Sequence, residues 1–118
     1  MELAAIIAEY NPFHNGHLYQ LQEIRRRGAT HIVAVMSGNV VQRAEVACFY
    51  KRTRAKAAVL SGVDLVIELP AIYACAPAER FAEGAVKTLA GLGIPGTLWF
   101  GSECGSLEQL KGCVAALR

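Results

Sequence analysis

The stretch Ala8-Glu9-Tyr10-Asn11-Pro12-Phe13-His14-Asn15-Gly16-His17 joins an apolar strand to an amphipathic helix. Residues 3–8 are apolar throughout, which favours a buried strand, and Pro12 stops that strand from running on. Beyond the stretch, apolar side chains recur at helical spacing, so one face of the next segment is apolar: Leu18, Leu21 and Ile24. The stretch therefore predicts a strand, a short turn and a helix, which is the beginning of an α/β fold.

The start of this helix is a favourable place for an anion. The first backbone N–H groups of a helix have no partner within it, and the helix dipole is positive there. His14 and His17 are three residues apart, so both can lie on one side of the first turn and donate hydrogen bonds to a phosphate. Gly16 between them leaves room for a ligand to approach the backbone. Because open α/β sheets bind ligands where strands end, these residues predict a phosphate site.

Two other interpretations of this histidine pair are open from the residues alone. Both histidines could be ordinary surface residues at a helix start, or they could bind zinc at i, i+3 spacing. No third and fourth ligands cluster with them in the sequence, so zinc ranks below phosphate. The cysteines form no Cys-x-x-Cys pair and indicate neither a zinc site nor a disulfide framework: Cys48, Cys75, Cys104 and Cys113. They are expected to be reduced thiols, as in a cytoplasmic protein.

The rest of the chain repeats the strand and helix alternation. Strands are expected at residues 30–36, 64–70 and 97–100. One helix is expected to end near residue 60, and two more are expected to begin near Pro77 and near Ser106. Residues 71–76 are expected to form a loop. This order predicts one Rossmann-like domain over residues 1–118, with a parallel sheet and helices on both faces. The Gly-x-Gly-x-x-Gly fingerprint of dinucleotide-binding folds is absent, so a nicotinamide enzyme is not expected.

Composition bounds the class of protein. The chain has 118 residues, of which 53% are hydrophobic, which is ample for the core of one domain. Its formal net charge of +2 does not by itself indicate a nucleic-acid partner. There is no apolar run of about 18 residues and no signal-peptide pattern, so neither a membrane span nor secretion is expected. The expected location is the cytoplasm.

Four ordered blocks resemble the tRNA(Met) cytidine acetate ligase family. They are Glu9-Tyr10-Asn11-Pro12-Phe13-His14-Asn15-Gly16-His17, Met36-Ser37-Gly38-Asn39-Val40-Val41-Gln42-Arg43, Asp64-Leu65-Val66-Ile67-Glu68-Leu69-Pro70 and Phe100-Gly101-Ser102-Glu103. Within the first block, residues 14–17 match the His-x-Gly-His signature of the nucleotidylyltransferase superfamily. The resemblance implies that ATP activates acetate to acetyl-adenylate. The acetyl group then passes to the wobble cytidine of elongator tRNA(Met), giving N4-acetylcytidine.

The resemblance also implies roles for particular residues. His14 and His17 would be catalytic, and magnesium would accompany ATP without dedicated protein ligands. The implied ATP-binding residues are Ile7, Ala8, Glu9, Tyr10, Asn11, Pro12, Phe13, His14, Asn15, Gly16, His17, Leu18, Tyr19, Gln20 and Gly101. The implied partners are acetate and tRNA(Met).

The densest positive stretch covers residues 43–56, which contain five basic residues and one acidic residue, Glu45. Arg43 and Lys51 are expected to contact phosphates of ATP or tRNA, given the resemblance and the position of this loop. For Arg54 a solvated helix face and a phosphate contact are both open, and the same holds for Lys56. The neighbouring aromatic pair is expected to anchor the segment rather than to stack on a base: Phe49 and Tyr50. Glu68 interrupts the third apolar strand, so it needs a basic partner or a place near the strand end.

Family members are several times longer than this chain, which therefore resembles their N-terminal part. Two other functions are open. The first is a small nucleotidylyltransferase that joins AMP to a phosphorylated metabolite. The second is a nucleotide-binding or RNA-binding module that performs no chemistry by itself.

Overall fold

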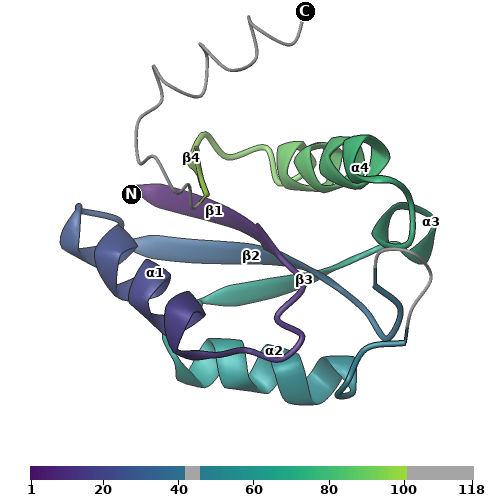
Figure 1. The fold of residues 1–118 in the computed structure, drawn as a ribbon. Coiled ribbons are helices and arrows are strands. Elements are labelled where there is room, and N and C mark those ends of the chain that lie inside the picture. Colours follow the sequence, from purple (N-terminus) through teal and green to yellow (C-terminus); the bar gives the residue numbers. More distant parts are fainter. Residues whose placement is uncertain (42–45, 101–118) are drawn as a thin grey trace, which may run out of the picture.

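A computed structural model describes residues 1–41 and 46–100, and these residues form a four-stranded sheet with helices on both sides (Figure 1). The elements in chain order are β1 (Leu3–Ala8), α1 (Asn15–Arg26), β2 (His31–Ser37), α2 (Lys51–Leu60), β3 (Leu65–Leu69), α3 (Ala71–Ala74), α4 (Ala78–Ala90) and β4 (Thr97–Trp99). The strand order is β3-β2-β1-β4. The predicted Rossmann-like α/β fold is confirmed, whereas the helix expected from Ser106 lies outside the described residues.

All strand pairs are parallel, so the strands end at one common edge. Ala8 at the end of β1 lies opposite Met36 of β2, and Ser37 lies opposite Leu69 at the end of β3. The segments that follow β1 and β2 therefore leave the sheet side by side. This carboxyl edge carries the histidine stretch and the loop that begins at Gly38.

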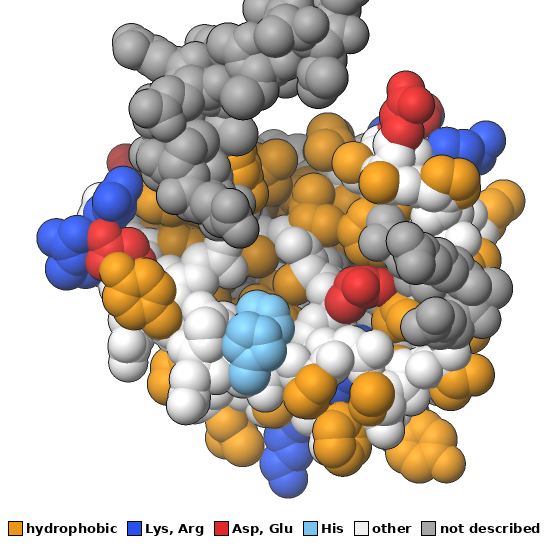
Figure 2. Space-filling model, viewed as in Figure 1, with side chains coloured by type: hydrophobic (Ala, Val, Ile, Leu, Met, Phe, Trp, Pro, Cys, Tyr) orange, Lys and Arg blue, Asp and Glu red, His pale blue; other side chains and the backbone are white. Residues whose placement is uncertain are grey.

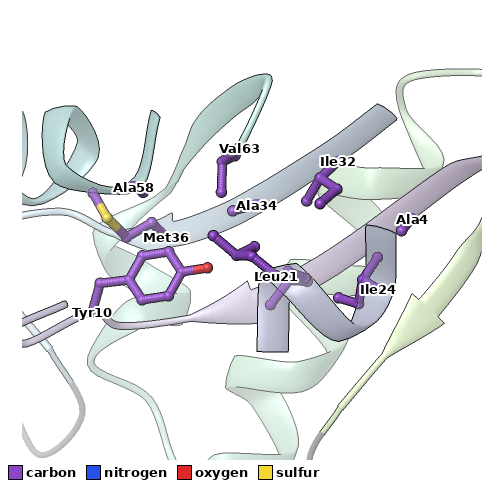
Figure 3. Packing of buried hydrophobic residues seen from close by; sticks show 10 residues of the cluster. Ala4, Tyr10, Leu21, Ile24, Ile32, Ala34, Met36, Ala58 and Val63 are labelled. Atoms are coloured by element: carbon purple, nitrogen blue, oxygen red, sulfur yellow. The ribbon is translucent and has the colours of Figure 1, made fainter. Parts of the chain in front are cut away.

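The larger core lies between the sheet and the α1–α2 layer (Figure 3). Alternate residues of a strand face the same side of a sheet, and in β2 these are Ile32, Ala34 and Met36. They are buried against Leu21 and Ile24 of α1. Two of the three apolar positions that the sequence assigned to one helix face are therefore in the core.

A smaller core lies on the α3–α4 side of the sheet. Val35 and Leu69 pack there against Ala74 of α3 and Ala85 of α4. Gly84 makes the close packing of the two helices possible, because a Cβ atom at this position would lie 2.2 Å from Cγ of Tyr73.

The expectation of a loop at residues 71–76 was wrong, since α3 occupies Ala71–Ala74. The N–H of Ala74 donates to the carbonyl of Pro70 at 3.0 Å, and that of Cys75 donates to the carbonyl of Ala71 at 3.1 Å. A single turn is too short to produce a periodic pattern in the sequence, and its stability comes from tertiary packing.

Glycine lies just beyond the end of each helix of the α1–α2 layer. Gly28 follows α1 with a φ of 109°, and Gly62 follows α2 with a φ of 126°. Side chains rarely tolerate these angles, so glycine allows the chain to turn back into the next strand. In residues 1–41 and 46–100 no helix is long and apolar enough to cross a membrane.

The arginine run at the end of α1 is engaged within the chain. Arg25 pairs with Asp64 at 2.7 Å and also donates to the carbonyl of Gly62 at 2.9 Å. Arg26 and Arg27 both pair with Glu23. The contacts of Arg25 join the end of α1 to the segment before β3, whereas those of Arg26 and Arg27 stay within α1 and its C-cap.

Candidate functional site

The turn between β1 and α1 is folded around Tyr10. Its φ is 49°, a left-handed value that is uncommon for a bulky residue, and its side chain is only 1% exposed. The tyrosine ring packs edge-on against Phe13 at 4.9 Å and against His17 at 4.8 Å between ring centroids. The Asn11–Pro12 peptide bond is cis. Tyr10 thus contacts His17 from within the core. Figure 3 shows the tyrosine ring among the buried side chains of that core.

The two histidines themselves cap helix α1. Nδ1 of His14 accepts the backbone N–H of Gly16 at 3.0 Å, and Nδ1 of His17 accepts the backbone N–H of His14 at 3.1 Å. This reciprocal pattern is a capping box, which Ser or Thr and Glu usually provide. Here two imidazoles perform both functions, so the start of α1 and the orientation of both rings are fixed together.

This capping determines which ring nitrogen of each histidine carries a proton. A nitrogen that accepts a hydrogen bond has no hydrogen of its own, so in the neutral rings of His14 and His17 the proton lies on Nε2. Neither Nε2 atom has a hydrogen-bond partner among residues 1–41 and 46–100. The rings stack with centroids 3.8 Å apart and planes at 22°. The site therefore presents two adjacent N–H donors at the positive end of a helix dipole.

The electrostatic environment keeps His17 neutral. Partial burial lowers its pKa from the usual value, and the nearby charge of His14 lowers it further. His17 is therefore a hydrogen-bond donor near neutral pH rather than a fixed cation. Figure 2 shows imidazole surface near the middle of the face that carries the site, beside a hollow with an apolar floor.

Gly16 has a structural role that the sequence did not show. A Cβ atom here would lie 2.9 Å from Cε1 and 3.1 Å from Nδ1 of His14, so a side chain would collide with the histidine ring. The approach of a ligand to the Gly16 backbone stays a prediction. Gly16 makes the histidine cap possible. The sequence could not reveal this, because it does not show that the His14 ring folds back over its own helix.

The loop after β2 is attached to the histidine turn. Oδ1 of Asn11 accepts the backbone N–H of Cys48 at 2.7 Å. Oδ1 of Asn39 accepts the backbone N–H of Lys51 at 2.8 Å and so caps α2 from twelve residues away. Asn39 thus lies in the loop that leaves the carboxyl edge of the sheet after β2. The sequence contained no sign of the contact between Asn11 and Cys48.

Arg54 connects three segments of the site from within. Only 2% of it is exposed, and its guanidinium donates to the carbonyls of Glu9, Gly38 and Phe49. Burial lowers the pKa of this guanidinium. Both sequence interpretations of Arg54, a solvated face and a phosphate contact, were therefore wrong. The signal was present in the helical spacing, since Arg54 lies four residues before the buried Ala58 and shares its face.

Glu68 has the basic partner that its place in a strand required. Nζ of Lys51 lies 3.0 Å from Oε1 and 2.9 Å from Oε2 of this carboxylate, near the end of β3. Both side chains are about half exposed. Gly38 gives the carboxylate room, because a Cβ atom there would lie 2.3 Å from Oε1. The phosphate contact expected for Lys51 stays a prediction.

The remaining predicted positions surround this arrangement or fall outside it. Ile7, Leu18 and Gln20 are half-buried, and Tyr19 is exposed. Arg43 and Gly101 lie outside the described residues. Within the described part of the chain, no three His, Cys, Asp or Glu side chains are grouped as metal ligands would be, and Cys48 and Cys75 are free thiols.

A family model described as HIGH Nucleotidyl Transferase matches residues 1–118. The chain belongs to this family. Two relatives are tRNA(Met) cytidine acetate ligases. The one from Alkaliphilus metalliredigens is 52% identical to this chain over 118 residues, and the one from Caldanaerobacter subterraneus subsp. tengcongensis is 56% identical over 112 residues. These matches cover 99% and 94% of the chain but only 28% of each relative. The chain thus spans about 28% of the length of these relatives.

A solved structure of the same kind of protein confirms the fold. Thermotoga maritima TmcAL, bound with alpha-thio ATP, superposes with a TM-score of 0.91 at 43% identity, over 99% of this chain and 29% of that one. The resemblance to tRNA(Met) cytidine acetate ligases that the sequence blocks indicated is therefore confirmed.

Proposed function

We propose that this chain is the ATP-binding domain of a tRNA(Met) cytidine acetate ligase. The observation that carries the proposal is the stacked His14–His17 pair, which presents two Nε2–H donors at the N-terminus of α1. A relative of 43% identity binds alpha-thio ATP. The proposed ATP contacts are residues 7–20 and Gly101, with Arg43 and Lys51 available to ATP or tRNA phosphates.

The proposed reaction has two steps. An acetate oxygen attacks the α-phosphorus of ATP, the bond to the β-phosphate breaks, and pyrophosphate leaves with its electron pair. The exocyclic amine of cytidine then attacks the carbonyl carbon of acetyl-adenylate, AMP leaves, and the amine loses a proton to give N4-acetylcytidine.

The contribution of the chain in the first step is positioning and charge stabilisation. The N–H donors of His14 and His17 have fixed directions, because each ring is held by its other nitrogen. They would stabilise the charge that builds up on the phosphates, without any covalent bond to the protein. Magnesium would arrive with the phosphates and neutralise their charge, since the described residues contain no group of three His, Cys, Asp or Glu side chains that could hold a metal ion.

The chain is much shorter than its relatives, and this difference in length supports a second candidate function. At about 28% of their length, the chain can be a binding module that holds ATP and leaves catalysis to a longer polypeptide. Both candidates require ATP at the histidine pair, and they differ in turnover.

Titration calorimetry with ATP tests the proposal on the native chain and on His17→Asn. The asparagine keeps an acceptor for the His14 N–H but removes the Nε2–H donor. We expect ATP binding that weakens about 10-fold in the variant, as is typical for the loss of one hydrogen bond to a charged group. Acetate-dependent exchange of pyrophosphate into ATP then separates the ligase domain from the binding module. A folded native chain that does not bind ATP would refute both candidates.

A further inference from the structure

Two large aromatic side chains stand exposed just before helix α2. Phe49 is 52% exposed and Tyr50 is 78% exposed. The sequence favoured an anchoring role for this pair, and for Tyr50 that expectation was wrong, since most of its surface faces solvent. Adjacent exposed aromatic residues of this size are typical of a binding surface.

The backbone beneath these side chains is held in place on the site. The N–H of Cys48 donates to Oδ1 of Asn11, and the carbonyl of Phe49 accepts from Nε of Arg54 at 3.1 Å. The same guanidinium donates to the carbonyl of Glu9 in the histidine turn. The aromatic pair is therefore fixed to the turn that carries the two histidines, rather than displayed on a separate loop.

Two cations of α2 have no carboxylate partner in the described chain. Arg52 and Lys56 are exposed and lie one helical turn apart, and residues 46–60 contain no acid. Their neighbours differ, because Lys51 pairs with Glu68 and Arg54 is buried. Arg52 and Lys56 thus supply positive charge beside the aromatic pair, where it is available to a ligand.

This combination matches the chemistry of an unpaired RNA segment. Single-stranded bases stack on exposed aromatic rings, and lysine and arginine neutralise the phosphates between them. A protein partner would use the aromatic surface but would not need two unneutralised cations.

We propose that Phe49, Tyr50, Arg52 and Lys56 form a docking surface for an unpaired RNA loop, on which one base stacks against Tyr50 next to the histidine turn. This inference rests on the proposed function, because it identifies where the RNA substrate approaches the ATP site.

Fluorescence polarisation of a labelled RNA hairpin with an unpaired, cytidine-containing loop tests the inference on the full chain. The same stem closed as a blunt duplex serves as the competing ligand. The variants are Tyr50→Ala and Tyr50→Phe, and Leu60→Ala is the matched control, since Leu60 is 77% exposed at the far end of the same helix. ATP binding is measured on every variant by calorimetry.

We expect the hairpin to bind more tightly than the duplex. Tyr50→Ala should weaken hairpin binding roughly 5- to 100-fold, as the loss of one stacked base predicts, while Tyr50→Phe and Leu60→Ala stay near the native value. In Arg52→Ala/Lys56→Ala the salt dependence of binding should become shallower.

The outcomes separate the inference from the proposed function. A chain that binds ATP but not the hairpin, or one in which Tyr50→Ala binds the hairpin like the native chain, overturns the RNA surface and leaves the ATP site standing. Loss of ATP binding in Tyr50→Ala would also overturn it, because Tyr50 would then act on the fold of the site. A native chain that binds neither ligand refutes both proposals.

Discussion

His14 and His17 hold one another in place: Nδ1 of His17 accepts the backbone N–H of His14 at 3.1 Å, and the two rings stack 3.8 Å apart. The same contacts that begin helix α1 therefore also orient the two Nε2–H groups. The same side chains cap the helix and carry the N–H donors proposed to bind phosphate, so an alanine substitution would remove both the cap and the donor. Substitutions that separate the two roles are needed.

His14→Asn separates capping from phosphate binding. Asparagine is a good N-cap and can accept the Gly16 N–H as Nδ1 of His14 does, but it has no group in the place of Nε2–H. We expect the free energy of unfolding to change by less than about 0.5 kcal/mol, whereas His14→Ala should lose about 1 kcal/mol. ATP affinity should fall in both variants. Urea unfolding and calorimetry measure the two quantities, and equal stability of the asparagine and alanine variants would contradict the capping role.

The lowered pKa of His17 predicts a pH dependence of stability. Because the pKa in the folded chain lies below that of the unfolded chain, the unfolded chain binds more protons as the pH falls through the unfolded value. The free energy of unfolding should therefore decrease as the pH falls from neutral into the mildly acidic range, and then level off below the folded pKa.

His17→Asn provides the comparison, since asparagine does not titrate there. The difference in unfolding free energy between native chain and variant should shrink as the pH falls, in urea titrations at a series of pH values from about 8 to about 5. A difference that is constant over this range would show that His17 has the same pKa in both states.

Removal of the buried hydroxyl of Tyr10 should not destabilise the fold and can stabilise it. It has no hydrogen-bond partner within the described residues, and burial raises the pKa of the phenol to about 12. Tyr10→Phe removes this unsatisfied group and keeps the ring contacts with Phe13 and His17. We expect the variant to be as stable as the native chain or up to about 1 kcal/mol more stable. ATP affinity should not change, because the hydroxyl is buried and the variant keeps the backbone and ring of residue 10. A thermal melt that falls by several degrees would indicate a partner for the hydroxyl.

Arg54 should be one of the least replaceable residues of the site. Arg54→Lys leaves an ammonium that cannot reach three carbonyls in the planar geometry of a guanidinium, so we expect a loss of about 2–4 kcal/mol. Arg52→Lys, two residues earlier on the exposed face of α2, is the matched control and should change stability by less than about 0.5 kcal/mol. Denaturant midpoints measure both, and similar values for the two variants would contradict the bridging role.

The ion pair between Lys51 and Glu68 is half exposed, so it should contribute little to folding. Glu68→Gln is expected to cost less than about 1 kcal/mol. If Lys51 contacts phosphate as proposed, this variant frees its ammonium, and the affinity for ATP or RNA should stay the same or rise. Lys51→Ala should lower that affinity. Calorimetry measures the affinity of both variants. If the affinity falls equally in Glu68→Gln and in Lys51→Ala, the ligand contacts the carboxylate rather than the lysine.

Much of the fold follows from local sequence. The apolar run at residues 3–8, the spacing of Leu21 and Ile24, and the glycines at 28 and 62 specify strands, a helix face and helix ends through short-range sterics and periodic burial. The motif at residues 14–17 likewise located the candidate site, because a strand followed by a helix places it at the carboxyl edge of a parallel sheet.

Only the tertiary structure decided which buried side chains hold the segments of that site together. The sequence left a solvated face and a phosphate contact open for Arg54. Its side chain is instead buried, because Glu9, Gly38 and Phe49 bring three carbonyls to one point in space. For Tyr10 the sequence predicted only an ATP contact, and the structure adds a buried ring that packs against His17. Sequence patterns record periodicity along the chain, whereas contacts between residues 9, 38 and 54 exist only after the strands have paired in register.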